Sequence, residues 1–210
     1  MYLARHDLAL LQAQTLTPIT LPTPGLRLEE LTAGQTEALE TTYRELGHRH
    51  PAGRSQQRFA NGLRFGRLWF GERLAGSLWV AQGTHRYIDE MNWRLWVPAH
   101  QFWLRDVFIA PAFRGQRLFL QLLHLVAEEW LPGFECAWSD VDWDNAESMG
   151  AHINAGFQVR HRVRALDFNG KLRWRDPLVP WPSLVSDLHP ERRWLWLAGE
   201  AQRRHLEWVA

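Results

Sequence analysis

The segment from Gln101 to Trp130 changes its hydrophobic periodicity once, and this change constrains the fold more than any other feature of the chain. Its first part, QFWLRDVFIA, is apolar and aromatic and ends at Pro111, which predicts a long strand. From Gly115 the apolar residues fall at helical spacing until Leu-Pro-Gly stops the helix after Trp130. A strand that leads through a short turn into a helix predicts an α/β (α+β) fold.

Turn signals divide the rest of the chain into further elements, in the predicted order β-α-α-β-β-β-α-β-α-β-β. The last two strands flank Asn169-Gly170, a strong two-residue hairpin signal. Residues 85–93 are predicted as a looser stretch. The other strands are predicted at 26–30, 67–70, 77–82, 101–110 and 135–141, and the helices at 32–49 with Thr32 as cap, 55–63, 115–130 and 146–156.

We expect one main domain at residues 24–179, preceded by an N-terminal extension, 1–23, and followed by a C-terminal helical extension, 180–210. The last segment begins with prolines and is predicted to be a helix from Pro190. One face of that helix carries Trp194, Leu197, Ala201, His205 and Trp208. This face is expected to pack on the same chain, with a homodimer contact as the alternative.

The composition, with 46% apolar and 22% charged residues, is that of an ordinary globular protein. A net charge of +1 gives no general attraction to nucleic acid or to a membrane, so neither is expected as a partner. Lys171 is the only lysine among 24 basic residues, and arginine favours bidentate contacts to phosphate and carboxylate. Cys136 is the only cysteine and no 18-residue apolar run occurs, which predicts a cytoplasmic protein.

The stretch SDVDWDNAESMGAHINAGF places Asp140, Asp142 and Asp144 at alternate positions, as a calcium loop does. That loop also needs glycine at its sixth place and glutamate at its twelfth, where this chain has Asn145 and Ala151. No metal is therefore expected. The stretch is predicted instead to be a strand end that leads into a helix capped by Asp144 or Asn145.

The turn Arg114-Gly115-Gln116-Arg117 lies at the predicted start of a helix. A helix N-terminus offers unpaired backbone N–H groups to an anion, and glycine lets the backbone come close to it. This turn is therefore a candidate seat for a pyrophosphate.

Two motifs together resemble the signature of the GNAT acyltransferase superfamily. In the first, a strand, a proline and R/Q-x-x-G-x-G/A open a helix, and Pro111 and Arg114 match it. The second, N-x-x-A-x-x-L-Y-x-K-x-G-F, corresponds here to Asn145, Ser148, Ala151, His152, Asn154, Gly156 and Phe157. The resemblance covers roughly Pro24 to Val179, and it implies the GNAT fold, a mixed central sheet with splayed strands flanked by helices.

The chain also departs from these motifs. Arg117 and Phe119 replace the two small residues of the phosphate loop, Ser148 stands at the alanine position, and His152 stands at the tyrosine position. The backbone N–H of Arg117 remains available to a phosphate, whereas Phe119 changes how closely the helix meets a cofactor.

By this resemblance the donor is acetyl-CoA, which acts as co-substrate. Its pantetheine arm would lie along Val107, Phe108 and Ile109, and its pyrophosphate would meet the N–H groups from Gln116 to Leu118 or Phe119. Asn145 would bond the pantetheine or hold the strand ends apart. The implied donor-binding residues are Val107, Phe108, Ile109, Arg114, Gly115, Gln116, Arg117, Leu118, Phe119, Asn145 and Ser148.

The implied reaction is direct attack of an acceptor amine on the thioester, with the N–H of Val107 or its neighbour stabilising the oxyanion. His152 is the candidate acid for the thiolate, although it is largely neutral at pH 7; the alternative is a packing histidine that bonds Asp142. The base remains open. Asp142 is taken as the candidate catalytic residue beside His152, and the other routes are water, Asp140, Asp106 and Glu90.

The predicted hairpin places Phe168 opposite Lys171, Leu166 opposite Arg173 and Arg164 opposite Arg175. One face then carries Arg160, Arg162, Arg164, Lys171, Arg173 and Arg175, and the buried face carries Val159, Val163, Ala165, Leu172 and Trp174. The basic face is expected to be solvated, to pair with carboxylates or to meet an anionic partner.

These observations predict an N-acyltransferase that takes acetyl-CoA and a primary amine on a small molecule. Two alternatives remain. One is a relative that uses longer acyl groups from CoA or an acyl carrier protein, and the other is a non-catalytic binding module of the same fold.

Overall fold

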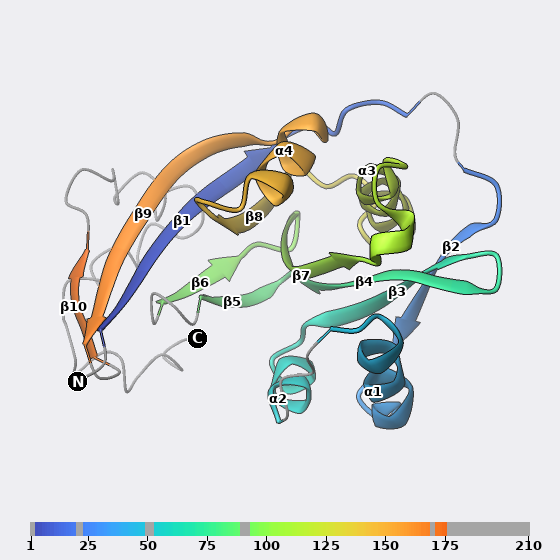
Figure 1. Cartoon of the computed structure of the whole chain (residues 1–210), viewed down its shortest axis with the longest axis horizontal. Helices are drawn as coiled ribbons and strands as arrows, with labels where there is room; N and C mark the ends of the chain where they lie inside the picture. The colour runs from blue at the N-terminus through green and yellow to red at the C-terminus, as the bar shows by residue number, and fades with distance from the viewer. Residues whose placement is uncertain (1–2, 20–22, 49–52, 89–92, 169–170, 176–210) are drawn as a thin grey trace.

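The computed structural model describes residues 3–19, 23–48, 53–88, 93–168 and 171–175, and a mixed sheet forms their centre (Figure 1). The eight strands of this sheet run in the order β10-β9-β1-β8-β7-β4-β3-β2. They are β1 (Leu3–Ala13), β2 (Leu26–Leu31), β3 (Arg64–Phe70), β4 (Arg73–Ala81), β7 (Gln101–Ile109), β8 (Cys136–Asp142), β9 (Gln158–Phe168) and β10 (Lys171–Arg175).

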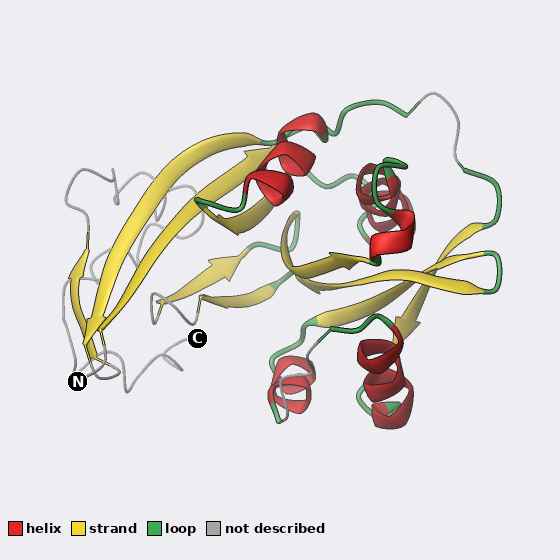
Figure 2. Ribbon diagram, in the orientation of Figure 1, coloured by secondary structure: helices red, strands yellow, loops and turns green. Residues whose placement is uncertain are grey.

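Helices cover both faces of the sheet, as Figure 2 shows. On one side lie α1 (Thr36–Glu45) and α2 (Arg54–Ala60), and on the other lie α3 (Leu118–Leu125) and α4 (Ala146–Asn154). This layered arrangement, with the mixed sheet, confirms the predicted fold class.

The N-terminal segment differs most from the sequence-based expectation. Residues 1–23 were set apart as an extension, yet β1 is an inner strand that pairs antiparallel with β8 and β9. Its residues Leu8, Leu10 and Leu11 are fully buried. Residues 3–13 carry no turn signal and their partners lie far along the chain, so the place of β1 depends on long-range pairing that local pattern does not reveal.

Strands β7 and β8 form the parallel pair of the sheet and pair over a short length. Their register runs from Gln101 with Cys136 to Leu104 with Ser139, although both strands continue further. Beyond this point β8 stays paired with β1, as far as Asp142 with Leu8. The two strands therefore part, which confirms the predicted splay.

The helix boundaries correct one predicted cap and settle another. The helix expected from Thr32 begins at Thr36, because Thr32 and Gln35 form a separate turn before it. In this turn the Thr32 N–H donates to the Gln35 side-chain oxygen at 2.8 Å, and the Gln35 N–H donates to the Thr32 carbonyl at 3.0 Å. The α4 cap is Asn145, whose side chain accepts a bond of 3.0 Å from the Ser148 N–H. Past α3 the chain continues as a π-helical turn, Val126–Trp130.

A second, two-stranded sheet occupies the stretch predicted to be looser. It consists of β5 (Thr84–Ile88) and β6 (Trp93–Val97), paired antiparallel. Three of its side chains, Ile88, Leu95 and Val97, are buried in the core on the α1 side. Burial of alternate residues therefore fixes this hairpin.

Three tryptophans lie at the centre of the core. Trp79, Trp103 and Trp138 are fully buried, and the last two stack with ring centroids 5.6 Å apart. Each indole N–H has an acceptor: Trp79 donates to Tyr43 at 2.9 Å, Trp103 to Asp140 at 2.6 Å and Trp138 to Gln101 at 2.8 Å. Such satisfied donors let large rings fill a core without a desolvation cost.

The hairpin register was predicted correctly only at its first pair. Phe168 lies opposite Lys171, but a bulge then places Leu166 opposite Trp174 and Ala165 opposite Arg175. A second irregularity lies between β9 and β1, and Val159, which was expected to be buried, is 40% exposed. A bulge adds one residue to one strand and so shifts every later cross-strand pair. The sequence alone does not show where such a bulge lies.

On β9 the predicted pairing of arginines with carboxylates is found at Arg162. Its guanidinium makes two bonds to the Asp7 carboxylate, of 2.8 and 2.7 Å. The turn residues Asn169 and Gly170, Glu90, and the C-terminal extension with its helix from Pro190 lie outside the described residues. Among the described helices, none has the length and apolar character needed to cross a membrane.

Gly76 allows close approach of β4 to β7 and gives a stability prediction. A Cβ at Gly76 would lie 2.5 Å from the Phe108 carbonyl oxygen, so Gly76→Ala forces the strands apart. We expect a loss of about 1–3 kcal/mol in the free energy of unfolding, measured by denaturant titration.

The matched control is Gly150→Ala inside α4, where a Cβ meets nothing within 4 Å. This substitution should raise the free energy of unfolding by about 0.5–1 kcal/mol, because alanine has a higher helix propensity than glycine. Equal effects at both positions would contradict the packing assigned to Gly76.

Candidate functional site

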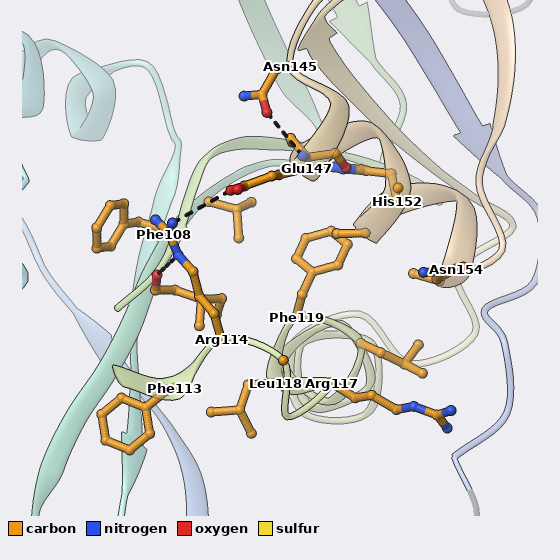
Figure 3. Close-up of a pocket in the computed structure, with 18 of the residues that line it drawn as sticks. Phe108, Phe113, Arg114, Arg117, Leu118, Phe119, Asn145, Glu147, His152 and Asn154 are labelled. Carbon is orange, nitrogen blue, oxygen red and sulfur yellow. Dashed lines mark hydrogen bonds and ion pairs between the residues drawn. The ribbon is translucent and has the colours of Figure 1, made fainter. Parts of the chain in front are cut away.

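A cleft of about 1010 Å³ lies between the end of β7, the turn into α3, and α4. Figure 3 shows its side chains. The sequence-predicted residues that line it are Val107, Phe108, Ile109, Arg114, Gly115, Arg117, Leu118, Phe119, Asn145, Ser148 and His152. Gln116 and Asp142 are not among the lining residues. Thr17 and Glu147 do line it, and no motif had pointed to them.

A β-bulge in β7 forms the inner end of the cleft. Arg105 lies opposite Trp79 and Phe108 opposite Ser77, so Asp106 and Val107 together face Leu78. Asp106 has φ of 46°, in the left-handed region that costs a non-glycine residue about 1–2 kcal/mol. A bulge leaves a residue outside the ladder, so its backbone groups are available to a ligand.

The start of α3 forms the second wall. Its backbone ladder begins with the Gln121 N–H, which donates to the Arg117 carbonyl at 3.2 Å. The N–H groups of Leu118, Phe119 and Leu120 therefore have no partner within the helix. Gly115 has φ of 76°, and a Cβ there would meet nothing within 4 Å. The turn thus leaves open space at Gly115, just before the start of α3.

Arg117 has a left-handed backbone, which glycine adopts without a steric cost. Its φ is 57° and its ψ is 21°. Figure 3 shows its guanidinium extending away from Arg114 and Glu147. The side chain therefore leaves that part of the cleft open.

Phe119 lies between the two helices. Its ring centroid is 4.6 Å from that of His152, and the ring is half-buried. Figure 3 shows it rising from α3 toward α4. Phe119 thus narrows the cleft on the side where the family has a small residue, while the cleft beside Arg114 stays open.

An ion pair joins the two walls. Arg114 lies 3.6 Å from Glu147, while its Nε donates to the Ile109 carbonyl at 3.2 Å. Both side chains are exposed, so the pair contributes little to stability. It nevertheless places a cation at the mouth of the cleft.

His152 is buried and both of its ring nitrogens are bonded. Nδ1 lies 2.8 Å from the Ser148 carbonyl, which only accepts, so Nδ1 carries the proton. In the neutral ring Nε2 then accepts from the Ser139 hydroxyl at 2.9 Å. Burial lowers the pKa of His152, against smaller raising effects of the Ser148 carbonyl and Asp140. The neutral ring therefore has no free N–H for a leaving thiolate.

The structure does not bring Asp142 and His152 together. Successive side chains of β8 alternate between faces, so Asp140 and Asp142 point away from the side where Ser139 meets His152. Asp140 accepts two bonds from Arg86 and one from Trp103. Asp106 pairs with Arg58 at 2.6 Å. Within the described part of the chain, no three His, Cys, Asp or Glu side chains gather as a metal site would require.

The comparisons with known proteins agree with this geometry at the level of the fold. No protein-family model and no curated protein sequence matches the chain. A protein from Novosphingobium aromaticivorans assigned to the GNAT acetyltransferase family has 20% identity and a TM-score of 0.50, over 78% of this chain and 64% of that one. A GNAT-family acetyltransferase from Colwellia psychrerythraea has 16% identity and a TM-score of 0.50, over 80% and 58%.

A Drosophila protein aligns with a TM-score of 0.52 at 12% identity, over 79% of this chain and 52% of that one. This chain thus spans about half to two-thirds of the length of these structures. At such identities the likeness establishes the fold, and it confirms the predicted GNAT fold.

The buried state of His152 gives a pH prediction. Its folded pKa lies below the ordinary value near 6.5, so the unfolded chain binds more protons at mildly acid pH. The contribution of neutral His152 to the free energy of unfolding should be fully present above about pH 6.5. It should be lost as the pH falls through the lower pKa of the folded state, with a slope of at most about 1.4 kcal/mol per pH unit.

His152→Gln should remove this part of the slope, measured by urea unfolding from pH 4.5 to 8. The control His100→Gln changes an exposed histidine and should keep it. An unchanged slope in the His152 variant would show that the ring titrates freely in the native state.

Proposed function

We propose that this chain, which has the GNAT fold, is an N-acyltransferase that moves an acetyl group from acetyl-CoA to a primary amine on a small molecule. The observation that carries the proposal is the position of the cleft. It lies where β7 parts from β8, and the unpaired N–H groups of α3 open on it. A thioester and a diphosphate need those two features at the two ends of one groove.

The donor is proposed to lie across the cleft from β7 to α3. The pantetheine arm carries amides that suit the free edge of Val107–Ile109, where β8 has turned away. The diphosphate suits the N–H groups at the start of α3, and the open space at Gly115 lets it approach. Arg114 supplies a nearby positive charge once it is released from Glu147.

The reaction is proposed to occur at the bulge. An acceptor nitrogen attacks the thioester carbonyl carbon, the carbonyl oxygen gains negative charge, and the carbon–sulfur bond then breaks to release CoA as a thiolate. The bulge places the Val107 N–H near the donor as a partner for the developing oxyanion. The amine proton leaves to water, because Asp106 and Asp140 are both held by arginines.

His152 is proposed to act as an acid only when it is doubly protonated. Its neutral form uses its single N–H on Ser148 and its lone pair on Ser139. At neutral pH the thiolate is therefore expected to take its proton from water, and His152 positions α4 against β8. Asp142, on the other face of β8, is proposed only as a residue near the acceptor.

A non-catalytic binding module remains the second candidate, and Phe119 is the observation that favours it. Its ring packs against His152 and narrows the cleft between α3 and α4. Release of free thiol from acetyl-CoA with an amine panel supports the enzyme. Turnover only with longer acyl chains supports the long-chain alternative. A CoA-induced thermal shift without any turnover supports the binding module.

The seat for the diphosphate is tested at Gly115. Gly115→Asp places a carboxylate in the open space in front of α3, and repulsion should weaken CoA binding about tenfold by calorimetry. Gly115→Asn is the matched control. It has the same shape without the charge and tolerates the left-handed backbone, so its affinity should stay within about twofold of the wild type.

Equal affinity of the aspartate variant and the wild type would place the diphosphate elsewhere. The small-molecule acceptor, the homodimer and the cytoplasmic location stay predictions.

A further inference from the structure

A cluster of charged side chains lies on the face of the sheet opposite the cleft, at the same parting of β7 and β8. Three arginines meet there from three elements: Arg58 from α2, Arg86 from β5 and Arg105 from β7. Burial alone would raise the pKa of the Asp106 carboxyl, but the positive charges of the three arginines outweigh it and hold this pKa below its ordinary value. Asp140 is the other carboxylate at this place.

Both carboxylates are already engaged. Asp106 lies 2.6 Å from Arg58 and 3.8 Å from Arg105. Asp140 accepts from Arg86 at 3.1 and 2.8 Å and from Trp103 at 2.6 Å. Neither carboxylate is therefore free to bind a cationic ligand or to serve as a base.

Two arginine nitrogens in the cluster have spare donor capacity. The second terminal nitrogens, Nη1, of Arg58 and Arg86 are buried and have no hydrogen-bond partner. The side chains themselves are only 7% and 3% exposed. A buried charged donor without an acceptor is costly, so each one calls for an explanation. An anion at this place would satisfy both.

The position of these donors relates them to the reaction. Asp106, which holds Arg58, directly precedes Val107 at the bulge where the thioester is proposed to lie. An anion bound by Arg58 would therefore lie beside the residue that precedes the proposed oxyanion donor. A short molecule bearing both an anion and an amine suits this arrangement, whereas a polycation would meet like charge.

We propose that the acceptor is an amino acid, with its carboxylate bound by the guanidinium groups of Arg58 and Arg86 and its amine directed to the thioester. This inference rests on the proposed function and names its substrate class. Arginine suits this role because its planar donors match a carboxylate. Removal of the carboxylate leaves the buried Nη1 groups of Arg58 and Arg86 without an acceptor, which is how such sites reject analogues.

The test compares matched acceptors in the full chain. Release of thiol from acetyl-CoA is measured with several amino acids and with the amines that remain when their carboxylate is removed, such as phenylalanine and phenethylamine. We expect kcat/KM to be roughly a hundredfold higher for the amino acids, expressed mainly in KM. Arg86→Gln should reduce this ratio at least tenfold.

Arg67→Gln is the matched control. Arg67 is also largely buried, pairs with Glu29 and has a buried nitrogen without a partner, but it lies on β3 away from the parting strands. It should keep the wild-type ratio. CoA calorimetry on both variants verifies that they are folded.

The two levels of the proposal fail differently. If the decarboxylated amines react as well as the amino acids, the acceptor inference is wrong while the acyltransferase stands. If no amine of either kind releases thiol, the proposed function is wrong. Calorimetry with N-acetyl amino acids and their neutral amides then tests the arginine site alone, and equal binding of acid and amide would overturn it.

Discussion

The parting of β7 from β8 after Leu104 and Ser139 is the constraint on which the rest of the structure depends. Two adjacent strands that stop pairing expose backbone groups inside a folded core, and such groups need partners. The bulge at Asp106 and Val107 bends β7 away, and its left-handed backbone is stabilised by the ion pair to Arg58. Backbone strain of this kind persists where the surroundings hold it, and it commonly marks functional sites.

Both faces of this opening offer hydrogen-bond donors. On the α3 and α4 side the cleft offers backbone N–H groups and the glycine turn, which suit an anionic donor. On the α2 side the arginines leave donors that suit an anionic acceptor. The replacements Arg117 and Phe119 change the walls of the cleft, and Arg117 holds a left-handed backbone at the turn.

The wall of the cleft between β7 and α3 could be predicted from the sequence because it is local. A strand, a proline and a glycine turn before a helix lie within one short segment, and most residues assigned from that segment line the cleft. The place of β1 could not be predicted, since its pairing with β8 and β9 spans nearly the whole chain. The predicted register of the β9–β10 hairpin was wrong beyond its first pair, because a bulge in β10 shifts the later pairs. Asp106 was named as a possible base, but its closest arginine partner, Arg58, comes from α2, which is distant in sequence.

A crystal structure with bound acetyl-CoA tests the central claim most directly. We predict the pantetheine arm beside Val107–Ile109, the diphosphate within hydrogen-bonding distance of the N–H groups of Leu118 and Phe119, and the thioester at the bulge. Coenzyme bound outside the cleft, or a cleft that stays closed by Phe119 at saturating coenzyme, would contradict the account.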